Sequence, residues 1–264
     1  MMQRDDAATR LPEHLAGRLS EQGWCLLPGV LTAAQAAEVR GRLVAAARTS
    51  EARGVPTTYI GLDPNPRNVR VFNLLDLDPI FIELIQHPLA LAAVRWLLGE
   101  HFLISNFTAN IALPGSGSMA MHSDQGIVTT PPWAAAEAIN VIWVLDDMDE
   151  DNGATRYVPG SQHWQTLADV PADARALSVP FEAPAGSILA MDGRLWHTSG
   201  ENRSADRERA LLFGFYCADH IRGQANWNVQ LRDAAQAGLS AQMREWLWLD
   251  QGNVRYGGTL TALP

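Results

Sequence analysis

The sequence predicts an α+β fold with a mainly β core, in which a helical N-terminal part packs on a sandwich or barrel of strands. Three observations lead to this fold class. Apolar residues recur at helical spacing through most of the first hundred residues, whereas from about residue 102 the chain changes to short runs rich in β-branched and aromatic side chains. Turn sequences such as PGSGS, DEDNGA and APAGS separate these runs. Strands at this spacing are typical of a sandwich or barrel and not of alternating βαβ units.

Helical periodicity marks four segments, residues 11–23, 32–48, 79–99 and 240–248. The second is the clearest, because Thr32 and Gln35 fit a capping box at its start. The third contains Pro88, which interrupts the helical pattern, and it ends at Gly99. The fourth carries two tryptophans that we expect to pack on the body of the protein.

Strands are predicted for residues 24–28, 102–113, 138–147, 176–181, 186–192 and 210–218. Between the helices, residues 50–68 hold three prolines and two glycines. This segment is too long and too polar for an ordinary connection, which favours a binding loop or lid.

The length and composition fit one domain. With 264 residues, of which 47% are hydrophobic, the chain can build a full core without a disulfide or a metal ion. We expect a single domain over residues 1–264. Residues 1–100 would form the mostly helical layer with the lid loop, residues 101–220 the β core, and residues 221–264 a C-terminal helical or loop extension.

The charge balance points to a small-molecule substrate. A net charge of −9 and a pI near 5.2 argue against a nucleic-acid partner or an anionic membrane surface, because both need a basic patch. The 20 basic residues are all arginines, so Schiff-base chemistry and lysine bases are excluded.

Cysteine use and the N-terminal sequence predict a cytoplasmic protein. We also expect a monomer or a homodimer. Cys25 and Cys217 are too few for a disulfide framework, and Cys25 lies in the apolar run WCLLP, which is typical of a buried, inert thiol. The sequence MMQRDDAATR lacks an apolar signal region, and no run approaches the ~18 apolar residues of a membrane span.

The stretch MHSDQG contains a candidate pair of metal ligands, His122 and Asp124. On a strand, residues i and i+2 point to the same face, so an imidazole and a carboxylate would reach one metal ion. The alternative is a surface turn in which Asp124 caps a neighbouring backbone group. A 2-His-1-carboxylate site also needs a second histidine from another strand. His197 is best placed, between two predicted strands, and the other five histidines lie in helices, turns or element edges.

Arg209 opens the strand ALLFGFY, twelve residues after His197. There it could present a bidentate fork to a carboxylate of a metal-bound diacid. The alternative is a surface salt bridge with Asp206 or Glu208.

These motifs together resemble the phytanoyl-CoA dioxygenase family of Fe(II)- and 2-oxoglutarate-dependent oxygenases. The similarity runs from QGWCLLPGVLTAAQ, through His122-x-Asp124 and VIWVLDDMDEDNGATRYVPGSQH, to LWHTSGENRSADRER and the strand that ends near Tyr216. The block NGA-x-R-x-VPGS is its most specific part. In this family the same position is commonly PGSH, where this chain has PGSQH.

The resemblance implies a double-stranded β-helix, or jelly roll, over residues 101–220, with Fe(II), 2-oxoglutarate and O2 as cofactor and cosubstrates. It implies that His122, Asp124 and His197 bind the iron, and that Arg209 binds the distal carboxylate of 2-oxoglutarate. Many members place this arginine eleven residues after the distal histidine, whereas this chain has Arg207 at ten and Arg209 at twelve. We select Arg209 because the apolar strand follows it.

Asn73 in RVFNLL and Thr155 in NGATRY resemble positions that help to hold the cosubstrate in fungal relatives. Ordinary packing and turn formation would also explain both residues.

The resemblance implies oxidation of a substrate, with release of succinate and CO2. Hydroxylation is the commonest outcome in such families, and desaturation, epoxidation or ring closure would use the same residues. We expect a small, largely apolar substrate of natural-product or lipid type, from secondary metabolism. Trp133 and Tyr59 are candidate apolar contacts, and Arg70 could receive a carboxylate. Two alternatives remain open from the residues: a zinc hydrolase that uses the same His2Asp set, and a non-catalytic cupin-like binding module.

Overall fold

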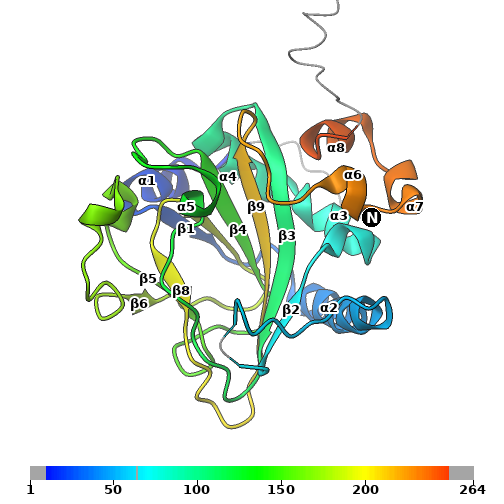
Figure 1. The fold of residues 1–264 in the computed structure, drawn as a ribbon, viewed down its shortest axis with the longest axis horizontal. Helices are drawn as coiled ribbons and strands as arrows, with labels where there is room; N and C mark the ends of the chain where they lie inside the picture. Colours follow the sequence, from blue (N-terminus) through cyan, green and yellow to red (C-terminus); the bar gives the residue numbers. More distant parts are fainter. Residues whose placement is uncertain (1–9, 64, 250–264) are drawn as a thin grey trace, which may run out of the picture.

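A computed structural model describes residues 10–63 and 65–249 of the chain (Figure 1). Six strands form a large antiparallel sheet in the order β1-β7-β4-β9-β3-β2. Their bounds are β1 Trp24–Leu27, β2 Asn68–Val71, β3 Phe102–Ala112, β4 Ala138–Val144, β7 Ile188–Asp192 and β9 Arg209–Ala218. A small sheet has the order β6-β5-β8, with bounds β5 Thr155–Tyr157, β6 Val179–Pro180 and β8 His197–Ser199.

The helices follow the predicted order. They are α1 Glu13–Gln22, α2 Ala33–Ala52, α3 Pro79–Ile85, α4 Pro88–Leu98, α5 Gln125–Val128, α6 Trp227–Gln230, α7 Asp233–Ala237 and α8 Ala241–Trp246, with short 3-10 turns η2 Leu74–Asp76, η3 Ser161–His163 and η4 Leu167–Asp169. The C-terminal helices lie beside β3, and α8 contacts that strand (Figure 1). The four predicted helices and six predicted strands are therefore confirmed in position. Strands β2, β5 and β8 and helices α5, α6 and α7 were not predicted, because three to five residues are too few to show a period.

Two apolar layers enclose the large sheet. On one face, residues such as Phe107, Val141 and Leu212 pack with the N-terminal helices in the main core. On the other face, Ile142 and Leu211 pack with residues of the small-sheet side such as Phe181. The part of this second face that is not filled by apolar packing becomes the candidate site.

A β-bulge in β3 determines which residues face that site. The pairing of β3 with β9 shifts between Ile104 and Asn106. A bulge adds one residue to a strand, so it exchanges the two faces of all residues beyond it. Before the bulge the even-numbered Ile104 lies in the main core, whereas after it the odd-numbered Phe107 does, and Asn106, Thr108 and Asn110 line the cavity.

Within the described residues, no single helix has the length and apolarity to cross a membrane. The pair α3 and α4 passes the length and composition test only when taken together, with a bend of 44° between the two helices. Residues Ala90–Val94 of α4 are buried in the main core.

The capping box of α2 predicts a stability effect. The Thr32 side chain accepts a hydrogen bond from the Gln35 backbone N–H at 3.2 Å, and the Gln35 side chain accepts one from the Thr32 N–H at 2.9 Å. We expect Thr32→Ala to lower the free energy of unfolding by about 1 kcal/mol, because the first turn loses a partner for its free N–H groups. Urea denaturation measures this change. Thr49→Ala, in the last turn of the same helix, is the control, and an equal loss there would contradict a specific role of the cap.

Candidate metal centre

His122 and His197 are brought together by a short antiparallel backbone pairing. The N–H of His122 donates to the His197 carbonyl at 3.0 Å, and the N–H of His197 donates to the His122 carbonyl at 2.8 Å. Their ring centroids lie 4.3 Å apart. Each Nδ1 lies 2.9 Å from the backbone carbonyl two residues earlier, Ala120 or Leu195. A carbonyl can only accept, so each Nδ1 carries the proton and each Nε2 has a free lone pair for a metal ion.

Asp124 completes the cluster from a turn, not from a strand. Its backbone is helical, with φ −64° and ψ −37°, at the start of α5. The prediction that a strand aligns His122 with Asp124 is therefore wrong, because only His122 takes part in a β-bridge. Asp124 Oδ1 nevertheless lies 3.6 Å from His122 Nε2 and 3.8 Å from His197 Nε2. One ligand atom from each residue lies within 4.8 Å of the other two, a spacing that can hold a metal ion.

The alternative in which Asp124 caps a backbone group does not describe this carboxylate. It makes no side-chain cap to α5. Its Oδ2 instead accepts a hydrogen bond at 2.8 Å from Nδ2 of Asn140, a residue of strand β4.

The charges of the three side chains suit metal binding. Burial is the main cause that lowers the pKa of His197 to about 4, so this imidazole is neutral at pH 7. Burial also opposes a charge on His122, but the adjacent Asp124 outweighs it and raises the pKa of His122 above its ordinary value. Burial likewise opposes ionisation of Asp124, yet His197, His122 and Asn140 together hold the pKa of its carboxyl well below the usual range. An ionised carboxylate therefore lies beside a neutral imidazole, as a metal ion requires.

The NGATRYVPGS block holds the segment that carries His197. Ser161 Oγ accepts from the Trp196 N–H at 2.9 Å and donates to the Val158 carbonyl at 2.7 Å. Gly153 has φ +84°, and a Cβ there would lie 3.1 Å from the backbone N of Asn202, so glycine suits this close approach. The most specific part of the sequence pattern thus supports the second histidine.

A cavity of about 270 Å³ opens beside the three side chains. Its polar lining includes the metal-site residues together with Arg70, Asn106, Thr108, Asn110, Asn140, Thr155, Ser199, Arg209 and Gln224. Its apolar lining is Leu62, Phe72, Met119, Ile127, Phe213 and Phe215.

Arg209 is a buried cation without an acidic partner in the described part of the chain. It is 1% exposed, and its Nε donates to the Gly153 carbonyl at 3.0 Å and its Nη1 to Asn110 Oδ1 at 3.2 Å. Its Nη2 and the Nδ2 of Asn110 are buried and have no hydrogen-bond partner there. Burial, with the nearby Arg70, lowers the pKa of Arg209 to about 10, so it remains charged at pH 7. A buried charge with one unused donor, beside a second unused donor on Asn110, provides a site for an anion.

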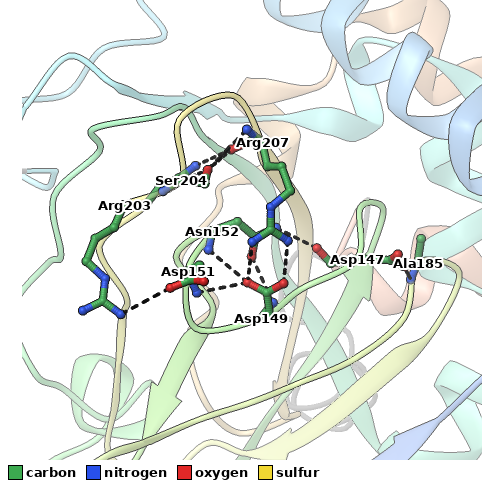
Figure 2. Close-up of polar contacts among 9 residues, drawn as sticks. Asp147, Asp149, Asp151, Asn152, Ala185, Arg203, Ser204 and Arg207 are labelled. Atoms are coloured by element: carbon green, nitrogen blue, oxygen red, sulfur yellow. Dashed lines mark hydrogen bonds and ion pairs between the residues drawn. The ribbon is translucent and has the colours of Figure 1, made fainter.

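Arg207 has a different environment. Its side chain is 45% exposed and forms two hydrogen bonds to Asp149, at 2.5 and 3.0 Å (Figure 2). It belongs to a polar surface network around the turn at Asp147–Asn152 and does not line the cavity. The surface salt bridge with Asp206 or Glu208 that was the alternative for Arg209 is not formed within the described residues, because Arg209 is buried and Glu208 pairs with Arg40.

The structure brings two of the remaining predicted residues to the cavity. Thr155 lines it and is buried. Arg70 also lines it, but both its Nε and Nη2 donate to the buried Asp63, at 3.0 and 2.8 Å. The guanidinium is therefore already paired within the protein, and a substrate carboxylate would have to compete with Asp63.

Three predicted residues lie away from the lining. Asn73 is the residue before η2, with a left-handed φ of 56°. Tyr59 is 43% exposed and packs edge-on against Phe72, with 5.2 Å between ring centroids. Trp133 is buried in a separate apolar cluster with Val158, Ala174 and Trp196.

Sequence reasoning missed Asn110 and Asn140. Each is a polar residue inside an otherwise apolar strand, in TANIAL and AINVIW. A buried amide needs hydrogen-bond partners, so an asparagine at the centre of such a run signals a polar site on that face of the sheet.

The arrangement fits a divalent metal with an anionic cosubstrate. Two imidazole nitrogens and one carboxylate oxygen form the ligand set of non-haem iron oxygenases, which leaves coordination positions open. The unused donors of Arg209 and Asn110 line the same cavity.

Comparisons with known proteins agree with this chemistry. The sequence model of the family described as Phytanoyl-CoA dioxygenase (PhyH) matches residues 19–210. Dioxygenase af480 of Aspergillus fumigatus is 49% identical over 251 residues, which cover 95% of this chain and 81% of that protein. Dioxygenase FUM3 of Gibberella moniliformis is 28% identical over 76% of this chain and 70% of its own length.

Two solved structures have a similar fold. HygX from Streptomyces hygroscopicus, with nickel and 2-oxoglutarate bound, has a TM-score of 0.61 and 17% identity over 79% of this chain and 87% of its own. The non-heme alpha ketoglutarate dependent epimerase SnoN from nogalamycin biosynthesis has a TM-score of 0.62 and 24% identity, over 81% and 82%. The predicted double-stranded β-helix is thereby confirmed.

Proposed function

The chain belongs to the phytanoyl-CoA dioxygenase family, and on this premise we propose that it hydroxylates a small, largely apolar substrate in the cavity beside His122, Asp124 and His197. The family makes it an Fe(II)- and 2-oxoglutarate-dependent dioxygenase that uses O2. The same three side chains would also suit a zinc hydrolase or a binding module, but membership of the family favours the dioxygenase.

The proposed ligands are the Nε2 atoms of His122 and His197 and the Oδ1 atom of Asp124. Bound there, the iron and its cosubstrate supply the oxidation of a substrate C–H bond, while 2-oxoglutarate is converted to succinate and CO2. The protein contributes two imidazoles with fixed rings, of which that of His197 is neutral, and an ionised carboxylate.

The buried Arg209 is the single observation that carries the cosubstrate proposal. A guanidinium that is 1% exposed and lacks a carboxylate partner in residues 10–63 and 65–249 gains most from an anionic ligand. Nη2 of Arg209 and Nδ2 of Asn110 would donate to the distal carboxylate of 2-oxoglutarate. Thr155, which lines the same cavity, is a candidate further donor.

The remaining lining supports an apolar substrate. Phe72, Phe213, Phe215 and Met119 line the cavity, and Leu62 and Ile127 are 41% and 59% exposed. Apolar side chains that line a cavity lose contact with water when an apolar ligand covers them, which favours binding of such a ligand. Because Asp63 already neutralises Arg70, we propose that the substrate needs no carboxylate. We propose that the substrate is a natural product, consistent with the origin of SnoN in nogalamycin biosynthesis.

Succinate release tests this function. We expect the purified protein with Fe(II) to release succinate only when 2-oxoglutarate and O2 are both present, and to release it faster when an apolar substrate from a panel of natural-product intermediates is added. Mass spectrometry of the stimulating compound should show a gain of one oxygen atom. Stimulation by charged compounds alone, or a product without added oxygen, would contradict the proposed substrate class or reaction.

A further inference from the structure

We propose that Asn140 is a positioning residue of the metal centre, which holds Asp124 Oδ2 so that Oδ1 alone is presented to the two histidines. This inference rests on the proposed metal ligands. Asn140 Nδ2 donates to Asp124 Oδ2 at 2.8 Å, while Asp124 Oδ1 lies 3.6 and 3.8 Å from the Nε2 atoms of His122 and His197.

Asn140 and Asp124 differ in how rigidly the backbone holds them. Asn140 lies in the middle of β4, paired with Met191 of β7 on one side and Phe215 of β9 on the other. Its neighbours Ile139 and Val141 are fully buried. Asp124 instead precedes α5, a helix of four residues, and has no strand to orient its side chain. Strand β4 therefore holds Asn140 in a fixed position, and the Asn140 amide in turn fixes the orientation of the Asp124 carboxylate.

Packing alone does not account for an asparagine at this position. Along β4, the residues on the same face are Ala138, Ile142 and Val144, which all belong to apolar clusters. Asn140 is 6% exposed, and its Oδ1 has no hydrogen-bond partner among the described residues. An apolar residue would avoid that unsatisfied acceptor, so the amide is explained by its donor, which binds Asp124.

Removal of the donor would free Oδ2. The carboxylate could then turn, and either oxygen could approach a metal ion. The amide therefore selects the oxygen that binds and keeps the other out of positions that the cosubstrate and O2 need.

Cobalt binding to the metal-free protein tests the proposal without any turnover. We expect Asn140→Leu and Asn140→Ala to raise the Co(II) dissociation constant about 10- to 100-fold, the usual effect of losing a partner that orients a ligand. The visible spectrum of bound Co(II) should also change, because the carboxylate coordinates differently. Asn106→Leu is the matched control. It makes the same substitution in the same cavity, but Asn106 donates to Gln224 at 2.9 Å and not to the metal site.

Three outcomes would overturn the proposal: Asn140 variants that bind Co(II) within about twofold of the unmodified protein, an unchanged spectrum, or an equal loss in Asn106→Leu. Thermal unfolding of the metal-free variants separates lost folding from lost binding. The alanine variant should fold even if the leucine variant does not, because its truncation opens onto the cavity. His122→Ala is the reference for the site itself. If the unmodified protein and His122→Ala bind Co(II) equally, the proposed metal ligands themselves are wrong. Such a result differs from one in which only the role of Asn140 is wrong.

Discussion

Replacing Arg209 by Ala is expected to raise the 2-oxoglutarate concentration for half-maximal turnover about 100-fold, equivalent to ~2.8 kcal/mol of binding free energy. The guanidinium is buried, its Nη2 is unused, and it lies on the cavity that contains the proposed metal ligands. A charged hydrogen bond to a carboxylate in such surroundings contributes more than one at the surface. Initial rates of succinate formation against 2-oxoglutarate concentration give the value.

Arg207→Ala is the matched control for this prediction. Both variants remove a guanidinium near the start of β9, but Arg207 is 45% exposed and paired with Asp149 on the surface. We expect it to leave the 2-oxoglutarate requirement within about twofold, since exposed ion pairs contribute little. The assignment is wrong if Arg207→Ala raises the requirement steeply and Arg209→Ala does not.

Replacing Asp124 by Ala is expected to reduce succinate formation below about 1% of the unmodified rate, because a lost ligand should cost more than the 10- to 100-fold loss that follows removal of an outer partner. Removal of this carboxylate also leaves two imidazoles without the anion that lies 3.6 and 3.8 Å from them. Activity and Fe(II) binding are measured together on the purified variant.

The fold should survive the same substitution. Asp124 caps no helix with its side chain, and it lines a cavity, so the loss of its side chain leaves no void in the main core. We expect the melting temperature of the metal-free protein to change by only a few degrees, as for other substitutions outside the core. Asp124→Asn is the companion variant, since it keeps the shape and removes the charge. Unfolding of both variants would mean that the role of Asp124 is structural.

Secondary structure was predictable wherever a local pattern was long enough. The capping box at Thr32 and the interruption at Pro88, where α4 begins, both lie where the sequence predicted them. Strand β8, which carries His197, has three residues and is defined by its pairing with β5 and with His122. No period is visible in so short a segment, so its discovery required the partner strand.

The candidate site likewise has parts that the sequence predicted and parts that only the structure revealed. The sequence motifs selected His122, Asp124, His197 and Arg209, and the structure places all four around one cavity. The motif around His122 suggested a strand, whereas the backbone turns into α5 at Asp124. The substrate contacts were less predictable, because Trp133 and Tyr59 were chosen for their side-chain type, and side-chain type does not determine direction.

The sequence by itself determined which chemical groups the protein has and their order along the chain, because ligand spacing, turn residues and strand patterns are local properties. Only the tertiary structure decided how these groups pair. Arg209 reaches Asn110 across 99 positions of the chain, and Asn140 reaches Asp124 across 16. Arg70 is bound by Asp63, and Arg207 by Asp149. These partnerships depend on strand register and on a bulge in β3, which arise from packing of the whole sheet and not from any one segment.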